Sequence, residues 1–255
     1  MTTTLQYILD KLLSISGLAS FNWQTVLLFI GVVAATFIIE LAFVGWENSA
    51  VKKVIQFNKS VRTDFIFWLL EIFNLYNIIA FFISLGICYY LVGLIQKSIH
   101  FNFVELISSP LLQFTIILLA SDLKNYVRHR VFHQLKPLWE LHAFHHSATS
   151  FSILTRYRGH FLETSIARFF DVIPFIFLGA PIQTYIAVKI LVEVHQLLIH
   201  SNITSSWGII GKYLLVSPAA HRLHHSINPA HFNKNYGNTF IFWDRLFGSY
   251  HKPEV

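Results

Sequence analysis

The sequence predicts an all-α protein: a multi-pass membrane helical bundle, with about four spans or hairpin equivalents, under a histidine-rich cytoplasmic cap. Two features of the composition point to this class. The 255 residues are 54% hydrophobic and 13% charged, with a mean hydropathy of +0.53, whereas soluble domains carry about 25% charged residues. The chain also holds 14 His, more than its 13 Asp and Glu together. Ionisable groups near a bilayer are costly and usually functional.

Two spans are expected in the first part of the chain. The first runs from Trp23 to Trp46 and has an interfacial anchor at each end. Its one acid, Glu40, is expected to face the interface or to be partly hydrated. The second runs from about Phe65 to Val92 and is long enough to tilt. The weakly amphipathic segment Gln6 to Leu18 is expected to lie on the membrane surface.

Two further apolar blocks follow. One begins after Pro110, or slightly earlier with Phe101 to Ile107 as its start and Pro110 as a kink, and continues to the sequence HRVFH. The other, Ile166 to Ile199, is interrupted where Gly179 and Pro181 favour a turn. We therefore expect a helical hairpin over 166–200, either two spans or a re-entrant pair. Residues 1–110 are predicted to anchor the protein and residues 111–255 to form its catalytic region.

Charge sets the expected orientation. Basic residues gather after the first span and at the end of the third: Lys52, Lys53, Lys59, Arg62, Lys124, Arg128 and Arg130. Because cytoplasmic loops carry the excess of Lys and Arg, the histidine-rich half is predicted to be cytoplasmic and the N-terminus to lie outside. The same bias accounts for the net charge of +6, so no nucleic-acid partner is expected. The single Cys88 excludes a disulfide or a multi-thiolate metal site within the chain.

The histidines are spaced in a way that suits metal ions. His129 and His133 are four apart and share a helical face, and Asp122 lies on the same stripe as a candidate ligand or orienting group. Two sets at i, i+3 and i+4 follow: His142, His145 and His146, then His221, His224 and His225. His195 and His200 diverge by about 140° on a helix, so one is expected to be a ligand while the other points elsewhere.

The number of imidazoles indicates two ions. The eight clustered histidines plus His200 exceed the four ligands of a tetrahedral zinc site. Imidazole accommodates Zn, Cu, Fe and Ni, so spacing leaves the metal open. A set of surface histidines explains one HxxxH pattern but explains three clusters poorly. The cap is therefore predicted to bind metal.

These residues resemble the fatty acid hydroxylase / sterol desaturase superfamily of membrane di-iron oxygenases. The resemblance covers roughly Ser121 to Tyr250, and its wording is most similar to the alkylglycerol monooxygenase type and its bacterial relatives. It rests on Asp122 and on the motifs HRVFH, LWELHAFHHS, HSN, SPAAHRLHHSINP, NKNYGNTF and WDRLFGSY. The histidine clusters come in the order typical of the family, and the residues that flank them match its motifs.

The resemblance implies metal ligands at nine positions: His129, His133, His142, His145, His146, His200, His221, His224 and His225. It leaves four candidates for a ligand or an orienting group: Asp122, His160, His195 and Asp244. Asp244 is expected to orient a ligand or to pair with Arg245 or Arg222, within a terminal turn that packs over the metal centre.

The activity implied by the resemblance is hydroxylation of an unactivated C–H bond of a lipid, with two iron ions, O2 and an external reductant. The reductant is expected to be a reduced pterin such as tetrahydrobiopterin or an electron-transfer protein, because the chain has no Gly-rich dinucleotide fingerprint. A lipid or sterol desaturase is the alternative on the same site. A membrane metal carrier is the alternative of another class, and it would place its ligands near mid-membrane. A zinc hydrolase fits less well, since HExxH is missing and the ligands are too many.

Overall fold

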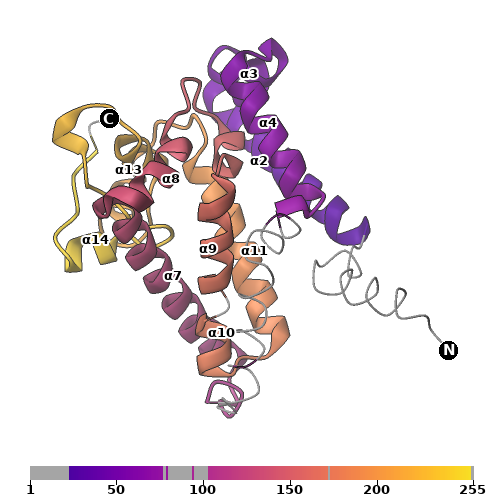
Figure 1. Cartoon of the computed structure of the whole chain (residues 1–255), viewed down its shortest axis with the longest axis vertical. Coiled ribbons are helices and arrows are strands. Elements are labelled where there is room, and N and C mark those ends of the chain that lie inside the picture. The colour runs from indigo at the N-terminus through magenta and orange to yellow at the C-terminus, as the bar shows by residue number, and fades with distance from the viewer. Residues whose placement is uncertain (1–22, 77–78, 80–93, 95–102, 172, 254–255) are drawn as a thin grey trace.

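The computed structural model describes residues 23–76, 79, 94, 103–171 and 173–253. Every regular element in these ranges is helical, and the one strand-type pairing among them is an isolated bridge between Leu215 and Phe240 (Figure 1). The predicted all-α class is thus confirmed over the described part of the chain. The elements are α2 (Trp23–Asn48), α3 (Ala50–Gln56), α4 (Lys59–Ile72), α7 (Pro110–Gln134), α8 (Lys136–His146), η1 (Ile153–Tyr157), α9 (Phe161–Asp171), α10 (Ile173–Leu178), α11 (Ile182–Ile199), α12 (Gly208–Tyr213), α13 (Pro218–His224), η2 (Pro229–His231) and α14 (Phe242–Leu246).

Helix α2 is the long apolar helix expected from Trp23 to Trp46. Over Val26–Asn48 it is long and apolar enough to cross a membrane, and no other helix of the described ranges is. Large apolar side chains such as Leu27, Ile38 and Phe43 are exposed along it. Apolar surface of this extent is typical of a lipid-facing or partner-facing helix. The expected number of about four spans stays a prediction.

Glu40 of α2 is fully buried, so the expected interface-facing position is wrong. Its Oε2 accepts a hydrogen bond from the backbone N–H of Ala50 at 2.7 Å, and its Oε1 accepts one from Asn202 at 2.5 Å. The reason lies at Gly45, whose φ of 69° breaks the helical path and lets α3 begin beside α2. Glu40 therefore ties the first helices to the loop that follows His200.

The second expected span, Phe65 to Val92, lies largely outside the described residues, as does Gln6 to Leu18. Its described part departs from the expectation. Helix α4 begins earlier, at Lys59, where Asn58 caps it, and it ends at Ile72. Asn74 has a left-handed φ of 56°, so the helix does not continue through this point.

Helix α7 begins at Pro110, so the expected start is confirmed and the alternative of an earlier start with a kink at Pro110 is wrong. The Ser109 hydroxyl caps the helix by accepting from the Leu112 N–H at 3.3 Å. Proline suits the first turn, where its missing N–H would have no helical partner. The preceding residues instead bind the hairpin tip: Val104 N–H donates to the Leu178 carbonyl at 2.8 Å.

The hairpin turn is confirmed. Helix α10 ends at Leu178, Gly179 adopts a φ of 61°, and α11 begins at Ile182. Helices α9 and α11 form the two arms, and α7 packs against α11 and α10 (Figure 1). Helices α7, α9 and α11 all lead to the end of the bundle where α8 and α13 lie (Figure 1).

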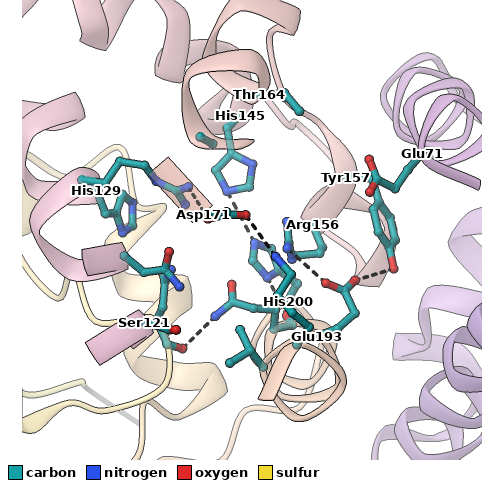
Figure 2. Close-up of a pocket in the computed structure, with 18 of the residues that line it drawn as sticks. Glu71, Ser121, His129, His145, Arg156, Tyr157, Thr164, Asp171, Glu193 and His200 are labelled. Carbon is teal, nitrogen blue, oxygen red and sulfur yellow. Dashed lines mark hydrogen bonds and ion pairs between the residues drawn. The ribbon is translucent and has the colours of Figure 1, made fainter. Parts of the chain in front are cut away.

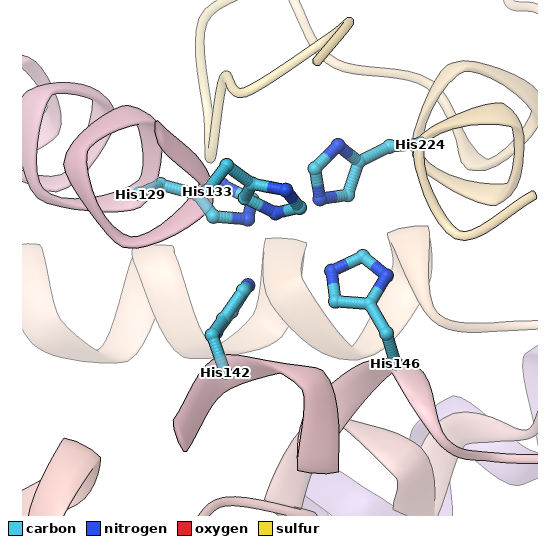
Figure 3. Close-up of side chains that lie close together, drawn as sticks. All are labelled: His129, His133, His142, His146 and His224. Carbon is cyan, nitrogen blue, oxygen red and sulfur yellow. The ribbon is translucent and has the colours of Figure 1, made fainter. Parts of the chain in front are cut away.

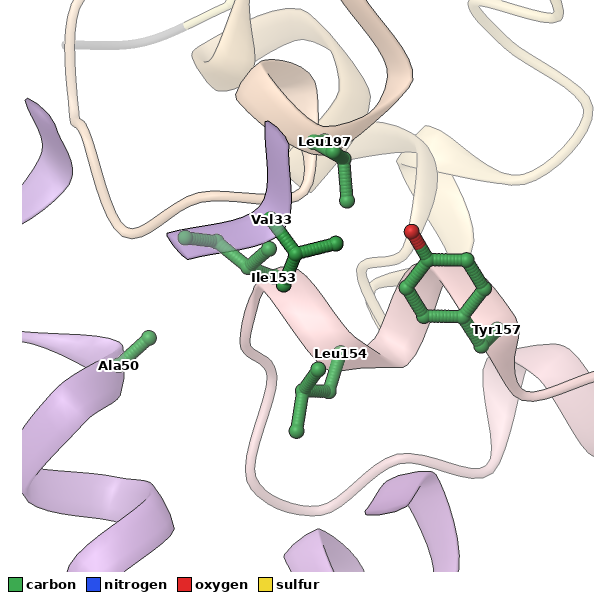
Figure 4. Packing of buried hydrophobic residues seen from close by; sticks show 6 residues of the cluster. All are labelled: Val33, Ala50, Ile153, Leu154, Tyr157 and Leu197. Atoms are coloured by element: carbon green, nitrogen blue, oxygen red, sulfur yellow. The ribbon is translucent and has the colours of Figure 1, made fainter. Parts of the chain in front are cut away.

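A buried apolar cluster holds the first helices to this bundle. Val33 of α2, Ala50 of α3, Ile153 and Leu154 of η1 and Leu197 of α11 meet here with Tyr157 (Figure 4). All are less than a tenth exposed. Burial of a side chain of this size contributes about 1.5–3 kcal/mol. The cluster fixes η1, whose neighbours carry site residues.

Candidate metal centre

Five imidazoles from three helices converge on one point. Helix α7 supplies His129 and His133, α8 supplies His142 and His146, and α13 supplies His224 (Figure 3). Their ligand-type nitrogens all lie within 4.8 Å of one another. The i, i+4 spacings bring each helical pair to one face, as the sequence predicts. We call this set the five-histidine group.

Four more imidazoles form a second set, the four-histidine group of His145, His200, His221 and His225, which also lies within 4.8 Å. The Nε2 atoms of His200 and His221 are 3.0 Å apart, and those of His221 and His225 are 3.2 Å apart. The two groups adjoin because neighbouring residues divide between them, and the rings of His146 and His225 stack at 4.2 Å. All nine predicted positions thus gather in two groups.

Backbone carbonyls fix the tautomer of four rings. The Nδ1 atoms donate to carbonyl oxygens in four pairs: His129 to Tyr236 at 2.8 Å, His145 to Arg158 at 3.0 Å, His200 to Gln196 at 2.7 Å, and His224 to Lys234 at 2.8 Å. A carbonyl only accepts, so Nδ1 must carry the proton. The Nε2 atom of each neutral ring is then unprotonated and carries a free lone pair.

The Nε2 atoms have the surroundings of metal donors. In the five-histidine group all five are buried without a hydrogen-bond partner. In the four-histidine group the Nε2 atoms of His145 and His200 face each other at 3.5 Å, although both are lone pairs. Such pairs repel unless a cation lies between them. Nitrogens bound to one ion at about 2.1 Å lie about 3.0–3.4 Å apart, which is close to the spacings in the four-histidine group. The nitrogens of the five-histidine group also lie close enough together to hold an ion.

Burial also keeps these ligands neutral. Loss of hydration lowers the pKa of both His145 and His224 to about 3, and the neighbouring His142 imidazole adds to the effect. Metal-binding imidazoles must be unprotonated. The site is therefore ready to bind a cation at neutral pH.

The two candidate carboxylates lie outside both groups and bind backbone amides instead. Asp122 accepts from the N–H groups of Thr239 and Phe240, each at 2.9 Å. Asp244 accepts from Tyr236 N–H at 2.7 Å, and Tyr236 in turn accepts the His129 proton. Asp244 thus orients a histidine through one backbone unit. It has no part in the alternative pairing, since Arg245 donates to the Lys212 carbonyl and Arg222 to that of Ser201.

The two remaining candidates, His160 and His195, lie outside both groups as well. His160 accepts from the Leu162 N–H at 3.3 Å and stacks on Phe161. His195 is buried on α11, with Trp207 at 5.7 Å between ring centroids. Of the pair His195 and His200, only His200 joins a group, which agrees with the expectation that one of the two would point elsewhere.

The sequence did not predict the residues that accept hydrogen bonds from the α8 histidines. Glu163 of α9 accepts from His142 Nδ1 at 2.6 Å. Arg158 supplies the carbonyl for His145, while its guanidinium donates to the buried Asp64 at 2.5 Å. Glu163 is the one carboxylate between residues 147 and 168, which is a usable signal. No local sequence pattern indicates the role of Asp64, because it lies 94 residues from Arg158.

A cavity of about 710 Å³ borders both groups. Its lining includes His129 and His142 of one group and His145, His200 and His221 of the other. Charged side chains from η1, α9 and α11 share this space with His145 and His200 (Figure 2). A substrate held here would lie beside both groups.

Comparison with known proteins gives a consistent result. The model of the fatty acid hydroxylase family matches residues 114–249, which is more than half of the chain. An ornithine lipid hydroxylase from Rhizobium tropici is 32% identical over 141 residues. An alkylglycerol monooxygenase from Caenorhabditis elegans is 29% identical over 133, and a Delta(7)-sterol 5(6)-desaturase from Gibberella zeae is 31% identical over 150.

The matches cover only part of each protein. They take in 55%, 52% and 56% of this chain and 42%, 26% and 38% of the three relatives, respectively. No solved structure matches the chain. The family match over residues 114–249 contains all nine clustered histidines.

Proposed function

The chain belongs to the fatty acid hydroxylase family, and from this we propose that it is an integral-membrane, non-haem di-iron lipid hydroxylase. One atom of O2 enters an unactivated C–H bond of a lipid, and the other leaves as water with electrons from an external donor. The observation that carries the proposal is the pair of buried imidazole groups beside one cavity.

We assign one iron ion to each group. The five-histidine group offers Nε2 of His129, His133, His142, His146 and His224, and the four-histidine group offers His145, His200, His221 and His225. Bound iron would supply the reduction and activation of O2 there. Carbonyl acceptors and Glu163 hold five of the nine imidazoles in one tautomer and orientation, which raises their strength as ligands: His129, His142, His145, His200 and His224.

Aromatic residues around the five-histidine group limit access of water. Trp139 and Tyr236 lie 4.9 and 5.2 Å from the His133 ring, and Phe132 lies 6.1 Å from His142. A water-excluded site strengthens electrostatic interactions and suppresses side reactions. Both effects favour a reaction in which the oxidant must react with the substrate and not with water.

The proposed location follows from α2 and the family. The protein is a multi-pass membrane protein in this proposal, with the histidine groups on the cytoplasmic side. There a reduced pterin, such as tetrahydrobiopterin, or an electron-transfer protein would deliver electrons. The basic residues that flank the expected spans support this orientation.

Desaturation on the same site is the second candidate, since a sterol desaturase is among the relatives. Lipid mass spectrometry separates the two. Cells that express the protein should contain a lipid heavier by one oxygen atom, which is missing from cells that express His224→Ala. A product lighter by two hydrogen atoms would instead identify a desaturase.

A metal carrier is the candidate of another class. It would move its ion across the membrane without consuming O2. The purified protein with lipid and reductant should consume O2, and an equal amount of His145→Ala protein should not. Full activity without bound transition metal would contradict the proposal, as would metal uptake by vesicles with no lipid oxidation.

A further inference from the structure

The cavity beside the histidines changes character along its length. On α11 its lining runs from Ile186 through Lys189, Ile190 and Glu193 to His200. At 1.5 Å per residue, Glu193 lies about 10 Å and Ile186 about 21 Å from His200 along the helix axis. The lining is therefore apolar at Ile186, carries the charged side chains Lys189 and Glu193 on either side of Ile190, and ends at the histidines.

The apolar end is open. Ile186 and Ile190 are exposed, and so is Leu28 of α2, which lines the cavity from the other side. Helices α2 and α11 pack against each other, and α2 is the candidate membrane span. This opening is placed where lipid would reach it.

The charged wall contains side chains of both signs. Glu193 accepts from Arg156 at 3.1 Å and from the Tyr157 hydroxyl at 2.8 Å (Figure 2). Asp171 accepts from Lys189 at 3.0 Å and also pairs with Lys124. The Nε of Arg156 is buried and has no hydrogen-bond partner. The wall thus has a spare donor as well as acceptors.

The histidine end is polar too. Asn125, Thr164, Gln196 and Asn238 line the cavity there together with the imidazoles. A hydrocarbon tail pushed past the wall would strip water from these groups and give no hydrogen bonds in return, which is costly. Ionisable groups on membrane-embedded helices commonly mark the path of a substrate.

We propose that the cavity takes its lipid head first, so that the headgroup contacts the charged wall and the oxidised carbon lies in the headgroup or next to it. The substrate class is a polar membrane lipid whose headgroup carries both hydrogen-bond donors and acceptors. A sterol, with a single hydroxyl, would leave most of the wall without a partner. This inference rests on the proposed hydroxylase function.

The position of the added oxygen tests it. The iron-loaded protein is incubated with O2, reductant and a total polar lipid extract, and products are fragmented in a mass spectrometer. The oxygen should remain with fragments that contain the headgroup or the carbons that adjoin it. Oxygen in the distal half of a chain, or on a sterol, would overturn the inference while leaving the hydroxylase intact. No oxygenated lipid at all would overturn the proposed function, and the inference with it.

A variant gives a second test. Glu193→Gln keeps an acceptor for Tyr157 but loses the ion pair with Arg156. It should raise KM for the polar lipid by about tenfold or more, with kcat and iron content close to those of the wild type. Glu140→Gln is the matched control, because Glu140 is exposed on α8 and does not line the cavity. An unchanged KM in Glu193→Gln would count against the headgroup contact.

Discussion

The ion pair between Asp64 and Arg158 should control the four-histidine group from a distance. Asp64 of α4 is fully buried and accepts from Arg158 Nε at 2.5 Å and from Thr155 at 2.9 Å. The carbonyl of the same Arg158 accepts the His145 proton at 3.0 Å. Asp64→Asn keeps the shape and removes the charge, so it leaves a buried guanidinium without its counter-charge.

The expected cost is large. Removing one partner of a buried ion pair destabilises a protein by about 3–5 kcal/mol. At about 2–4 °C per kcal/mol for a chain of this size, the midpoint of thermal unfolding should fall by roughly 6–20 °C. Loss of the carbonyl that orients His145 should also weaken metal binding to the four-histidine group by about 10–100-fold.

Thermal unfolding in detergent and metal content under a competing chelator measure the two effects. The matched control is Glu47→Gln, the same acid-to-amide change in the pair with Lys52, where Glu47 is 75% exposed. Surface pairs contribute about 0–1 kcal/mol, so this control should barely change the midpoint. Equal midpoints and equal metal content for Asp64→Asn and Glu47→Gln would refute the reasoning.

Three further predictions concern separate contacts. Glu163→Ala should weaken metal binding by about 10–100-fold in a chelator titration because His142 loses its acceptor, whereas Glu163→Gln should keep most of the affinity; equal loss in both would contradict this. Glu40→Ala should speed proteolysis of the loop at Asn202, because the backbone N–H groups of Ala50 and Asn202 lose their acceptor at a cost of about 1–3 kcal/mol each. A wild-type cleavage rate would show that Glu40 does not hold this loop. The pKa of His224 is lowered to about 3 by burial, against about 6.5 in an unfolded chain. Between these values the unfolded chain binds a proton that the folded chain excludes. The free energy of unfolding of the metal-free protein should therefore fall as the pH drops below about 6.5, by up to about 1.4 kcal/mol per pH unit. A thermal midpoint that stays constant down to about pH 5 would be inconsistent with a buried neutral ring.

Helical periodicity was enough to predict that these histidines gather at one site, but the two expected sets of three, His142/His145/His146 and His221/His224/His225, are each divided between the two groups. Positions i and i+4 must share a face, so HRVFH and the two HxxHH motifs each present a cluster. Periodicity could not predict how neighbours divide. His145 and His146 are consecutive and diverge by about 100° around α8, and they join different groups because helices from distant parts of the sequence lie on either side.

The roles of the acids depended on tertiary contacts that no local pattern contains. Asp122 shares the stripe of His129, but its carboxylate binds amides of a segment 117 residues away. Glu40 stands in an apolar helix, and only the break at Gly45 brings α3 within its reach. Pro110 is compatible with a kink or with a helix start, and the Ser109 cap decides for the start.

Metal stoichiometry tests the central claim most directly. We predict two iron ions per chain in the purified wild-type protein, and one in His221→Ala, in which the five-histidine group is intact. Lipid-dependent consumption of O2 should require both ions. A single metal ion in the wild type, zinc in place of iron in the active protein, or full activity of His221→Ala would contradict the account.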